Sequence, residues 1–228
     1  MVLGELFGPG AQVAELRGRG DPRALFPEEA CSVARAVDKR VHEFAAGRIC
    51  ARRLLRMFGV NDFALRVGED RQPLWPDGLA GSITHTTGFC AAVVAQRSDM
   101  SALGIDSELA GSVKSELWNS ICTPSEVGWL QSLPDGQQAC AATLLFSAKE
   151  AFYKCQYPLT GQWLGFHDVR VEAPDWGGRG GTFRVHATRD IAFAEHAELP
   201  LQGRYLLHEQ FLTTGIALLS RPYRRETP

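Results

Sequence analysis

The stretch SALGIDSEL, residues 101–109, contains two acids, Asp106 and Glu108, directly after an apolar run. Its apolar residues indicate a β-strand, in which residues two apart point to the same face. The two carboxylates can therefore converge on one point, where a hard cation such as Mg²⁺ would find oxygen ligands. A solvated strand edge with two ordinary acids has the same spacing, and spacing alone favours that simpler interpretation.

The residues before this stretch predict a helix followed by strands. Residues 27–58 have apolar positions at helical spacing, and Gly59 is a suitable stop. GSITHT (81–86) and FCAAVVAQ (89–96) resemble two strands joined by a tight turn. Together with residues 101–109 they predict a small antiparallel meander.

The residues after it repeat that order. A broken helical zone at 113–132 precedes a strong amphipathic helix, AATLLFSAKEAFYKCQ (141–156). Four strands are then predicted at residues 166–173, 182–189, 203–210 and 211–220. The polar tail RPYRRETP (221–228) is expected to be frayed.

Helix then strands, twice over, predicts an α+β fold of two similar halves that meet near Asp106. We divide the chain into an N-terminal half, 1–110, and a C-terminal half, 111–228, which together form one unit.

Composition narrows the class of protein. The chain has 228 residues, 45% of them hydrophobic, and a formal net charge of −2, so no global field favours nucleic acid or a membrane. It has no apolar run of about 18 residues, and its first residues lack a signal-peptide pattern. The six cysteines are scattered and resemble buried free thiols. We expect a cytoplasmic protein.

The segment FSAKEAFYK (146–154) contains a possible third acid. Glu150 and Lys154 are four apart and share a helical face, where they could contact a metal and a phosphate. Only 4 of the 24 cationic residues are lysines, which favours a specific role for Lys154. However, Ser147 and Glu150 also match a helix capping box, and Glu150 precedes Lys154 in the order of a stabilising ion pair.

A basic helix and a polar strand end complete the inventory. Residues 35–56 hold seven Arg and Lys against two acids, and Arg48, Arg52 and Arg56 share one face. Thr84 and His85 end a short strand, where their side chains can meet phosphate oxygens. A solvated basic face and a structural histidine are the simpler alternatives. Three acids, several cations and a polar strand end are the parts needed for phosphoryl chemistry with a metal.

These motifs resemble those of the 4′-phosphopantetheinyl transferases, in particular the type similar to enterobactin synthetase component D within the surfactin-type superfamily. The matching stretches occur in the family's order and spacing: EFAAGRICA (43–51), RQPLWPDGLAGSITHT (71–86), GIDSE (104–108) and LLFSAKEAFYKCQYPLT (144–160).

The resemblance implies two α+β halves related by a pseudo-twofold axis, with coenzyme A in the cleft between them. It implies a monomeric, Mg²⁺-dependent enzyme. This enzyme would transfer the 4′-phosphopantetheine arm of coenzyme A to a serine of an apo acyl or peptidyl carrier protein and release adenosine 3′,5′-bisphosphate.

The resemblance also implies roles for individual residues. The implied metal ligands are Asp106, Glu108 and Glu150. The implied coenzyme A-binding residues are Arg40, Arg48, Arg71, Thr84, His85, Asp106 and Lys154. Among them, Arg48 and less directly Arg40 correspond to the 3′-phosphate, Thr84 and His85 to phosphates, Lys154 to the pyrophosphate and Arg71 to the adenine. Glu150 and Lys154 are the implied catalytic pair, with Glu150 as the base, directly or through a metal-bound water.

Three alternatives remain at this point. A short holo-(acyl-carrier-protein) synthase confined to fatty-acid synthesis would have about half this length. A non-catalytic coenzyme A-binding protein would gain nothing from three acids beside a polyanion. A metal-dependent phosphohydrolase is the third. The sequence identifies neither the carrier protein nor a role for Ser107.

Overall fold

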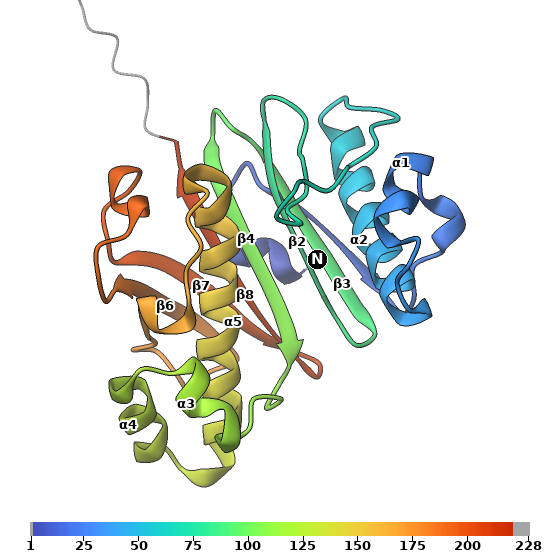
Figure 1. The fold of residues 1–228 in the computed structure, drawn as a ribbon. Helices are drawn as coiled ribbons and strands as arrows, with labels where there is room; N and C mark the ends of the chain where they lie inside the picture. Colours follow the sequence, from blue (N-terminus) through green and yellow to red (C-terminus); the bar gives the residue numbers. More distant parts are fainter. Residues whose placement is uncertain (1, 221–228) are drawn as a thin grey trace, which may run out of the picture.

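In a computed structural model of the chain, residues 2–220 are described, and the tail predicted to be frayed, 221–228, lies outside them. Two antiparallel sheets form the framework, and each is covered by one long helix (Figure 1). The strands are β1 (Gln12–Arg17), β2 (Leu79–Thr86), β3 (Phe89–Gln96), β4 (Met100–Leu109), β5 (Val169–Glu172), β6 (Gly180–Ala187), β7 (Leu201–His208) and β8 (Phe211–Leu219). The helices are α1 (Pro27–Ala30), α2 (Asp38–Met57), α3 (Trp118–Ile121), α4 (Pro124–Ser132) and α5 (Asp135–Thr160), with short 3-10 turns between them. No helix in residues 2–220 is long and apolar enough to cross a membrane.

The N-terminal half packs α2 on a sheet of order β1-β3-β2. Strand β3 is buried along almost its whole length, because α2 covers one face, and the N-terminal residues 3–7 together with residues of the second sheet cover the other. The helix predicted over 27–58 is interrupted: Val37 has an extended backbone, and α2 begins only at Asp38. Strand β1 was not predicted from the sequence.

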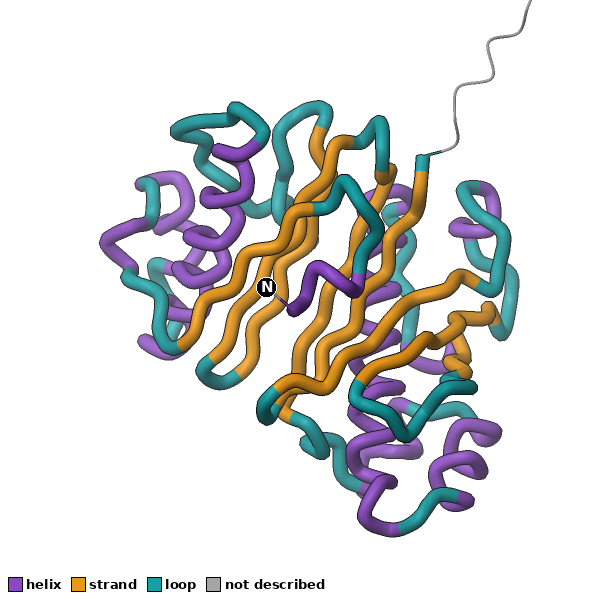
Figure 2. The backbone as a smooth tube through the Cα atoms, turned by 180° about the vertical axis from the view of Figure 1, so that it is seen from behind, coloured by secondary structure: helices purple, strands orange, loops and turns teal. Residues whose placement is uncertain are grey.

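The C-terminal half packs α5 on a sheet of order β4-β8-β7-β6-β5. Helix α5 contains the predicted segment 141–156 and extends beyond it at both ends, until Gly161 ends it in a left-handed conformation (φ 62°). The four late strands form where they were predicted, within a few residues. The helix–sheet layers of the two halves confirm the α+β fold of two similar halves (Figure 2).

The predicted meander is wrong in one respect. Strand β4 forms where expected, but it pairs with β8 of the other sheet, with Asp106 opposite Thr214. The reason is that both edges of β3 are already occupied, one by β2 and the other by β1. The division of the two sheets therefore falls between β3 and β4, before the boundary at 110 that the sequence suggested.

The two sheets meet where β2 lies beside β4. They are joined by side chains: Ser82 Oγ accepts the Ile105 N–H at 3.2 Å, and Thr84 Oγ1 accepts the Ser107 N–H at 2.9 Å. An edge strand has backbone groups that need partners, and these two hydroxyls supply them. The junction holds the end of β2 against the acidic part of β4.

Candidate active site

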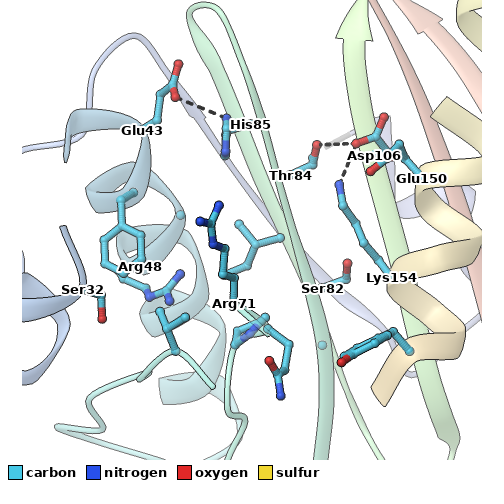
Figure 3. A pocket seen from close by; sticks show the side chains of 18 of the residues that line it. Ser32, Glu43, Arg48, Arg71, Ser82, Thr84, His85, Asp106, Glu150 and Lys154 are labelled. Carbon is cyan, nitrogen blue, oxygen red and sulfur yellow. Dashed lines mark hydrogen bonds and ion pairs between the residues drawn. The ribbon is translucent and has the colours of Figure 1, made fainter. Parts of the chain in front are cut away.

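A pocket of about 670 Å³ lies between the two halves, and it brings together all nine residues singled out from the sequence. They come from α2, β2, β4, α5 and the loop before β2 (Figure 3). They are Arg40, Arg48, Arg71, Thr84, His85, Asp106, Glu108, Glu150 and Lys154. Long-range folding has therefore gathered side chains that lie up to 114 positions apart in the chain.

Asp106 is the centre of one end of this pocket. Its Oδ1 accepts from Lys154 Nζ at 2.7 Å and from Thr84 Oγ1 at 3.3 Å (Figure 3). Its Oδ2 is buried and has no hydrogen-bond partner. A buried carboxylate oxygen without a partner is costly, so this atom is a candidate for a ligand that the protein itself does not provide.

Glu108 and Glu150 add negative charge beside Asp106. Burial, assisted by the charge of Asp106, raises the pKa of Glu108 to about 7. Burial also raises the pKa of Glu150, an effect that Lys154 opposes and Asp106 reinforces. For Lys154, burial disfavours the ammonium, but Asp106 outweighs it and raises the pKa. Three carboxyl groups thus share one lysine, and we call this region the acidic end.

The acidic end fits a hard divalent cation that shares its coordination with other ligands. Within residues 2–220, no group of three His, Cys, Asp or Glu side chains is arranged to hold a metal ion by itself. Mg²⁺ seldom needs such a cage, because it keeps several waters and binds through one or two carboxylates plus substrate phosphates. The unpartnered Asp106 Oδ2 and the excess of carboxylates match that mode of binding.

Arg48 forms the opposite, cationic end of the pocket. Its guanidinium lies 3.9 Å from the centre of the Phe44 ring, and its Nε donates to the Leu65 carbonyl at 2.9 Å. Burial lowers its pKa to about 10, which leaves it charged at neutral pH. Arg71 and Ser32 line the same end (Figure 3).

Arg52, one turn along α2, has a structural role. It pairs with the buried carboxylate of Glu29 at 2.6 Å and donates to the Ala24 carbonyl at 2.6 Å. Glu29 also accepts the Leu65 N–H at 2.9 Å. The Arg52–Glu29 pair therefore holds Leu65 in place, and the Leu65 carbonyl is the acceptor for Arg48. Of Arg48, Arg52 and Arg56, which share one face of the helix, only Arg48 lines the pocket.

His85 connects the two ends. Arg40 can only donate, so its contact of 2.5 Å makes His85 Nε2 the acceptor. His85 Nδ1 then carries the proton and faces Glu43 Oε2 at 3.6 Å. Burial, reinforced by the charge of Arg40, lowers the His85 pKa and favours this neutral form.

Thr84 lines the pocket at the end of β2, beside β4. Its hydroxyl is almost fully buried, donates to Asp106 and accepts from the Ser107 N–H. Its hydrogen-bonding capacity is therefore directed mainly at β4, and it holds the acidic end in place.

The capping-box alternative for Glu150 is excluded. Helix α5 begins at Asp135, so Ser147 and Glu150 lie in its interior and not at its N-terminus. Glu150 is instead one of the residues lining the pocket.

Other residues that line the pocket were not predicted from the sequence. Tyr153 and Tyr157 lie on the same face of α5 as Glu150 and Lys154, with stacked rings 5.3 Å apart. Helical spacing from Glu150 could have identified them. Asp70, Trp75 and Ser32 could not have been found in this way, because they reach the pocket from loops and short turns.

The six cysteines are all free, as predicted, although Cys31 is exposed and Cys140 is only partly buried.

Comparison with known proteins identifies the family. The model of the "4'-phosphopantetheinyl transferase N-terminal domain" matches residues 27–95, and that of the "4'-phosphopantetheinyl transferase superfamily" matches residues 102–208. The chain is 40% identical to 4′-phosphopantetheinyl transferase Svp of Streptomyces mobaraensis over 200 residues, 85% of this chain and 78% of that protein. It is 33% identical to 4′-phosphopantetheinyl transferase Npt of Nocardia iowensis over 222 residues, 95% of this chain and 99% of that protein.

Two further matches are partial. Enterobactin synthase component D of Escherichia coli is 39% identical over 137 residues, 58% of this chain and 62% of that protein. The crystal structure of Thermotoga maritima holo-[acyl-carrier-protein] synthase superposes with a TM-score of 0.40 and 22% identity, over 54% of this chain and 65% of that chain.

The matches to Svp and Npt cover most of the chain, and the two family models meet where the two sheets divide. The chain therefore belongs to the 4′-phosphopantetheinyl transferase family, and it is an enzyme that transfers the 4′-phosphopantetheine arm of coenzyme A to a carrier protein.

Proposed function

We propose that the two ends of the pocket bind the two separate phosphate groups of coenzyme A. The observation that carries this proposal is that one pocket has a cationic end at Arg48 and an acidic end at Asp106. The 3′-phosphate would bind Arg48, with Arg40 nearby, and the adenine would lie along Arg71. The pyrophosphate would then lie toward Lys154 and His85.

We propose that Asp106, Glu108 and Glu150 hold Mg²⁺ at the acidic end. Three carboxyl groups would repel a pyrophosphate unless a cation lies between them, and the single charge of Lys154 beside them does not balance three acids. When bound, Mg²⁺ would supply positive charge to the phosphate oxygens on which negative charge accumulates during transfer.

Glu150 is the proposed base. The Oγ–H of the carrier serine is a weak nucleophile, and Glu150 would take its proton as the oxygen attacks the β-phosphorus of coenzyme A. The new bond joins serine Oγ to phosphorus. The bond that breaks joins this phosphorus to the bridging oxygen, and adenosine 3′,5′-bisphosphate leaves with that electron pair.

Lys154 and His85 would stabilise the charge that develops. The Lys154 ammonium has three protons. Its Nζ donates one to Asp106 Oδ1, with the two atoms 2.7 Å apart, and another to the Ile105 carbonyl at 3.3 Å. The remaining proton is available for a pyrophosphate oxygen. His85 lines the same pocket, and it would be a second donor once its Nδ1–H turns from Glu43 to a phosphate oxygen.

We further propose a monomer that works in the cytoplasm. All nine candidate residues come from one chain, so a second copy is not needed to complete the pocket. The six free cysteines suit a reducing compartment. Size-exclusion chromatography with light scattering tests the first point, because a dimer mass would contradict it.

The decisive experiment incubates the protein with coenzyme A, with and without Mg²⁺, and with and without an apo carrier protein. We expect the carrier to gain the mass of one phosphopantetheine only when both Mg²⁺ and coenzyme A are present. Cleavage of coenzyme A without a carrier would indicate a phosphohydrolase, and binding without either reaction would indicate an inert coenzyme A-binding protein. A panel of acyl and peptidyl carriers would then identify the class of carrier.

A further inference from the structure

Glu150 and Asp106 come from different elements, α5 and β4, and their relative position depends on how α5 lies on the sheet. At one point the two backbones are in direct contact: a Cβ on Gly104 would lie 1.8 Å from the Ala151 carbonyl oxygen. This contact sets how closely α5 approaches β4. A glycine has no side chain to hold a register, so it does not prevent the helix from sliding or rolling.

A second, directional contact lies one helical turn away. Thr214 on β8 donates its hydroxyl proton to the Ser147 carbonyl at 2.9 Å. That proton is then used, so the 2.9 Å contact between the two hydroxyls has Ser147 Oγ as donor and Thr214 Oγ1 as acceptor. Both residues are fully buried. We call this reciprocal pair the hydroxyl clamp.

The position of the hydroxyl clamp connects it to the acidic end. Thr214 is the cross-strand partner of Asp106, so the two side chains lie on the same face of the sheet. Ser147 lies three residues before Glu150 on α5 and therefore on the same side of the helix. The clamp thus joins Thr214, which lies beside Asp106, to Ser147, which lies one helical turn before Glu150.

The other strong anchor of α5 lies on a different face. Lys149 is held by Glu126 and by the Ile121 and Phe166 carbonyls, so it ties α5 to α3, α4 and the turn before β5. That anchor does not involve β4 or β8. Among the hydrogen bonds of residues 2–220, α5 side chains are joined to the two strands at the site by the clamp and by Lys154, which donates to Asp106 and to the Ile105 carbonyl.

We propose that Ser147 and Thr214 are positioning residues that fix the separation of Glu150 from Asp106 and so set the affinity of the acidic end for Mg²⁺. This inference rests on the proposed function of the acidic end. Neither residue lines the pocket, so both act through the acids that their neighbours carry.

The test compares Thr214→Val with Thr214→Ser. Valine keeps the shape of threonine but can make neither hydrogen bond, whereas serine can make both. We expect Thr214→Val to raise the Mg²⁺ concentration for half-maximal activity about tenfold, because it loses both hydrogen bonds of the clamp. It should also lower kcat, because misplacing a reacting group by about 1 Å can cost up to 10²-fold. The KM for coenzyme A should change little, and Thr214→Ser should remain within about twofold of the wild type on each measure.

A binding measurement provides a readout that does not depend on turnover. The thermal stabilisation by coenzyme A is followed as Mg²⁺ is titrated, and its midpoint should shift upward in Thr214→Val by a similar factor. Ser147→Ala, which removes one of the two hydrogen bonds, should shift it in the same direction by less. This second variant keeps the test decisive if Thr214→Val does not fold.

Thr143→Val is the matched control. Thr143 lies on α5 one turn before Ser147, is equally buried, and uses its hydroxyl to accept the Val113 N–H at 3.1 Å. Its loss should lower Tm without changing the Mg²⁺ midpoint. The proposal is overturned if Thr214→Val keeps a wild-type Mg²⁺ midpoint, or if Thr143→Val shifts that midpoint equally.

Glu150→Gln is run alongside to separate the two hypotheses. If Glu150→Gln has impaired turnover and Thr214→Val keeps wild-type values, the positioning role of the clamp is refuted and the proposed function stands. If Glu150→Gln behaves as the wild type, the proposed function of the acidic end is refuted, and the clamp proposal fails with it.

Discussion

Two lysines on α5, five residues apart, occupy opposite kinds of environment. Lys149 is fully buried, and its ammonium lies within 2.9 Å of three acceptors: Glu126 and the Ile121 and Phe166 carbonyls. Lys154 keeps 28% of its side chain exposed and neighbours three carboxyl groups, one of which has a buried oxygen without a partner. In the first region every charge is paired, and in the second negative charge is in excess.

This difference in charge pairing distinguishes a region that stabilises the fold from a region that can bind a ligand. A buried ion pair whose hydrogen-bonding groups are all used can accept no ligand, so the Lys149 region holds α3, α4 and β5 together. Unpaired carboxyl groups in a pocket cost stability, which is a reason to look there for a missing ligand. The predictions below test this division between the two regions.

The largest effect is expected for Asp106→Asn. The change keeps an oxygen to accept from Thr84 but removes the charge that would bind Mg²⁺. We expect no measurable carrier modification at ordinary Mg²⁺ concentrations, in a protein whose circular dichroism is unchanged. Wild-type turnover would return Asp106 and Glu108 to the status of ordinary acids on a strand edge.

Glu150→Gln should lower kcat for carrier modification by about 10²- to 10⁴-fold, the usual loss when a general base is removed. Because burial raises the pKa of Glu150, the folded protein disfavours the charged carboxylate, and the Tm of the neutral glutamine variant should equal or exceed that of the wild type. The two measurements are made on the same preparation. A large fall in Tm with normal turnover of the folded protein would assign Glu150 to the structural region instead.

Lys149→Met should lower the free energy of unfolding by about 3–5 kcal/mol, because it leaves Glu126 buried without its counter-charge. Turnover per folded molecule should stay close to that of the wild type. Urea denaturation measures the first quantity, and active-site titration with labelled coenzyme A normalises the second. Adding Glu126→Gln should recover part of the lost stability.

Lys154→Ala should show the opposite pattern. Its Tm should fall less than that of Lys149→Met, because the Lys154 side chain is partly exposed and lines the pocket, although Asp106 itself is buried. A charged hydrogen bond is worth about 1.5–3 kcal/mol, so kcat should fall about 10- to 100-fold, less than for Glu150→Gln. A loss of stability as large as that of Lys149→Met would contradict the division between the two lysines.

The smallest effect is expected at the cationic end. Arg48→Ala should weaken coenzyme A about tenfold more than 3′-dephospho-coenzyme A, because only coenzyme A carries the 3′-phosphate. Arg48 also donates to the Leu65 carbonyl, so some stability will be lost. The ratio of the two dissociation constants is therefore the readout, and equal weakening of both ligands would show that Arg48 does not contact the 3′-phosphate.

Local periodicity predicted much of the candidate site. The alternation of a strand places Asp106 and Glu108 on one face, and helical spacing places Glu150 and Lys154 together. Both patterns depend only on neighbouring residues, and both elements form where they were predicted. The same local rule could not separate Lys149 from Lys154, because their difference comes from what packs against each face of α5.

The sequence by itself determined the order of helices and strands, the two-half α+β plan and the acids and cations that line the pocket. Tertiary structure alone decided that β4 belongs to the second sheet, because β1 and β2 already occupy both edges of β3. It also decided that Ser147 bonds Thr214 instead of capping a helix, because the start of α5 lies twelve residues earlier. The partners of strand edges and buried hydroxyls lie far apart in the chain, so a pattern of neighbouring residues cannot predict them.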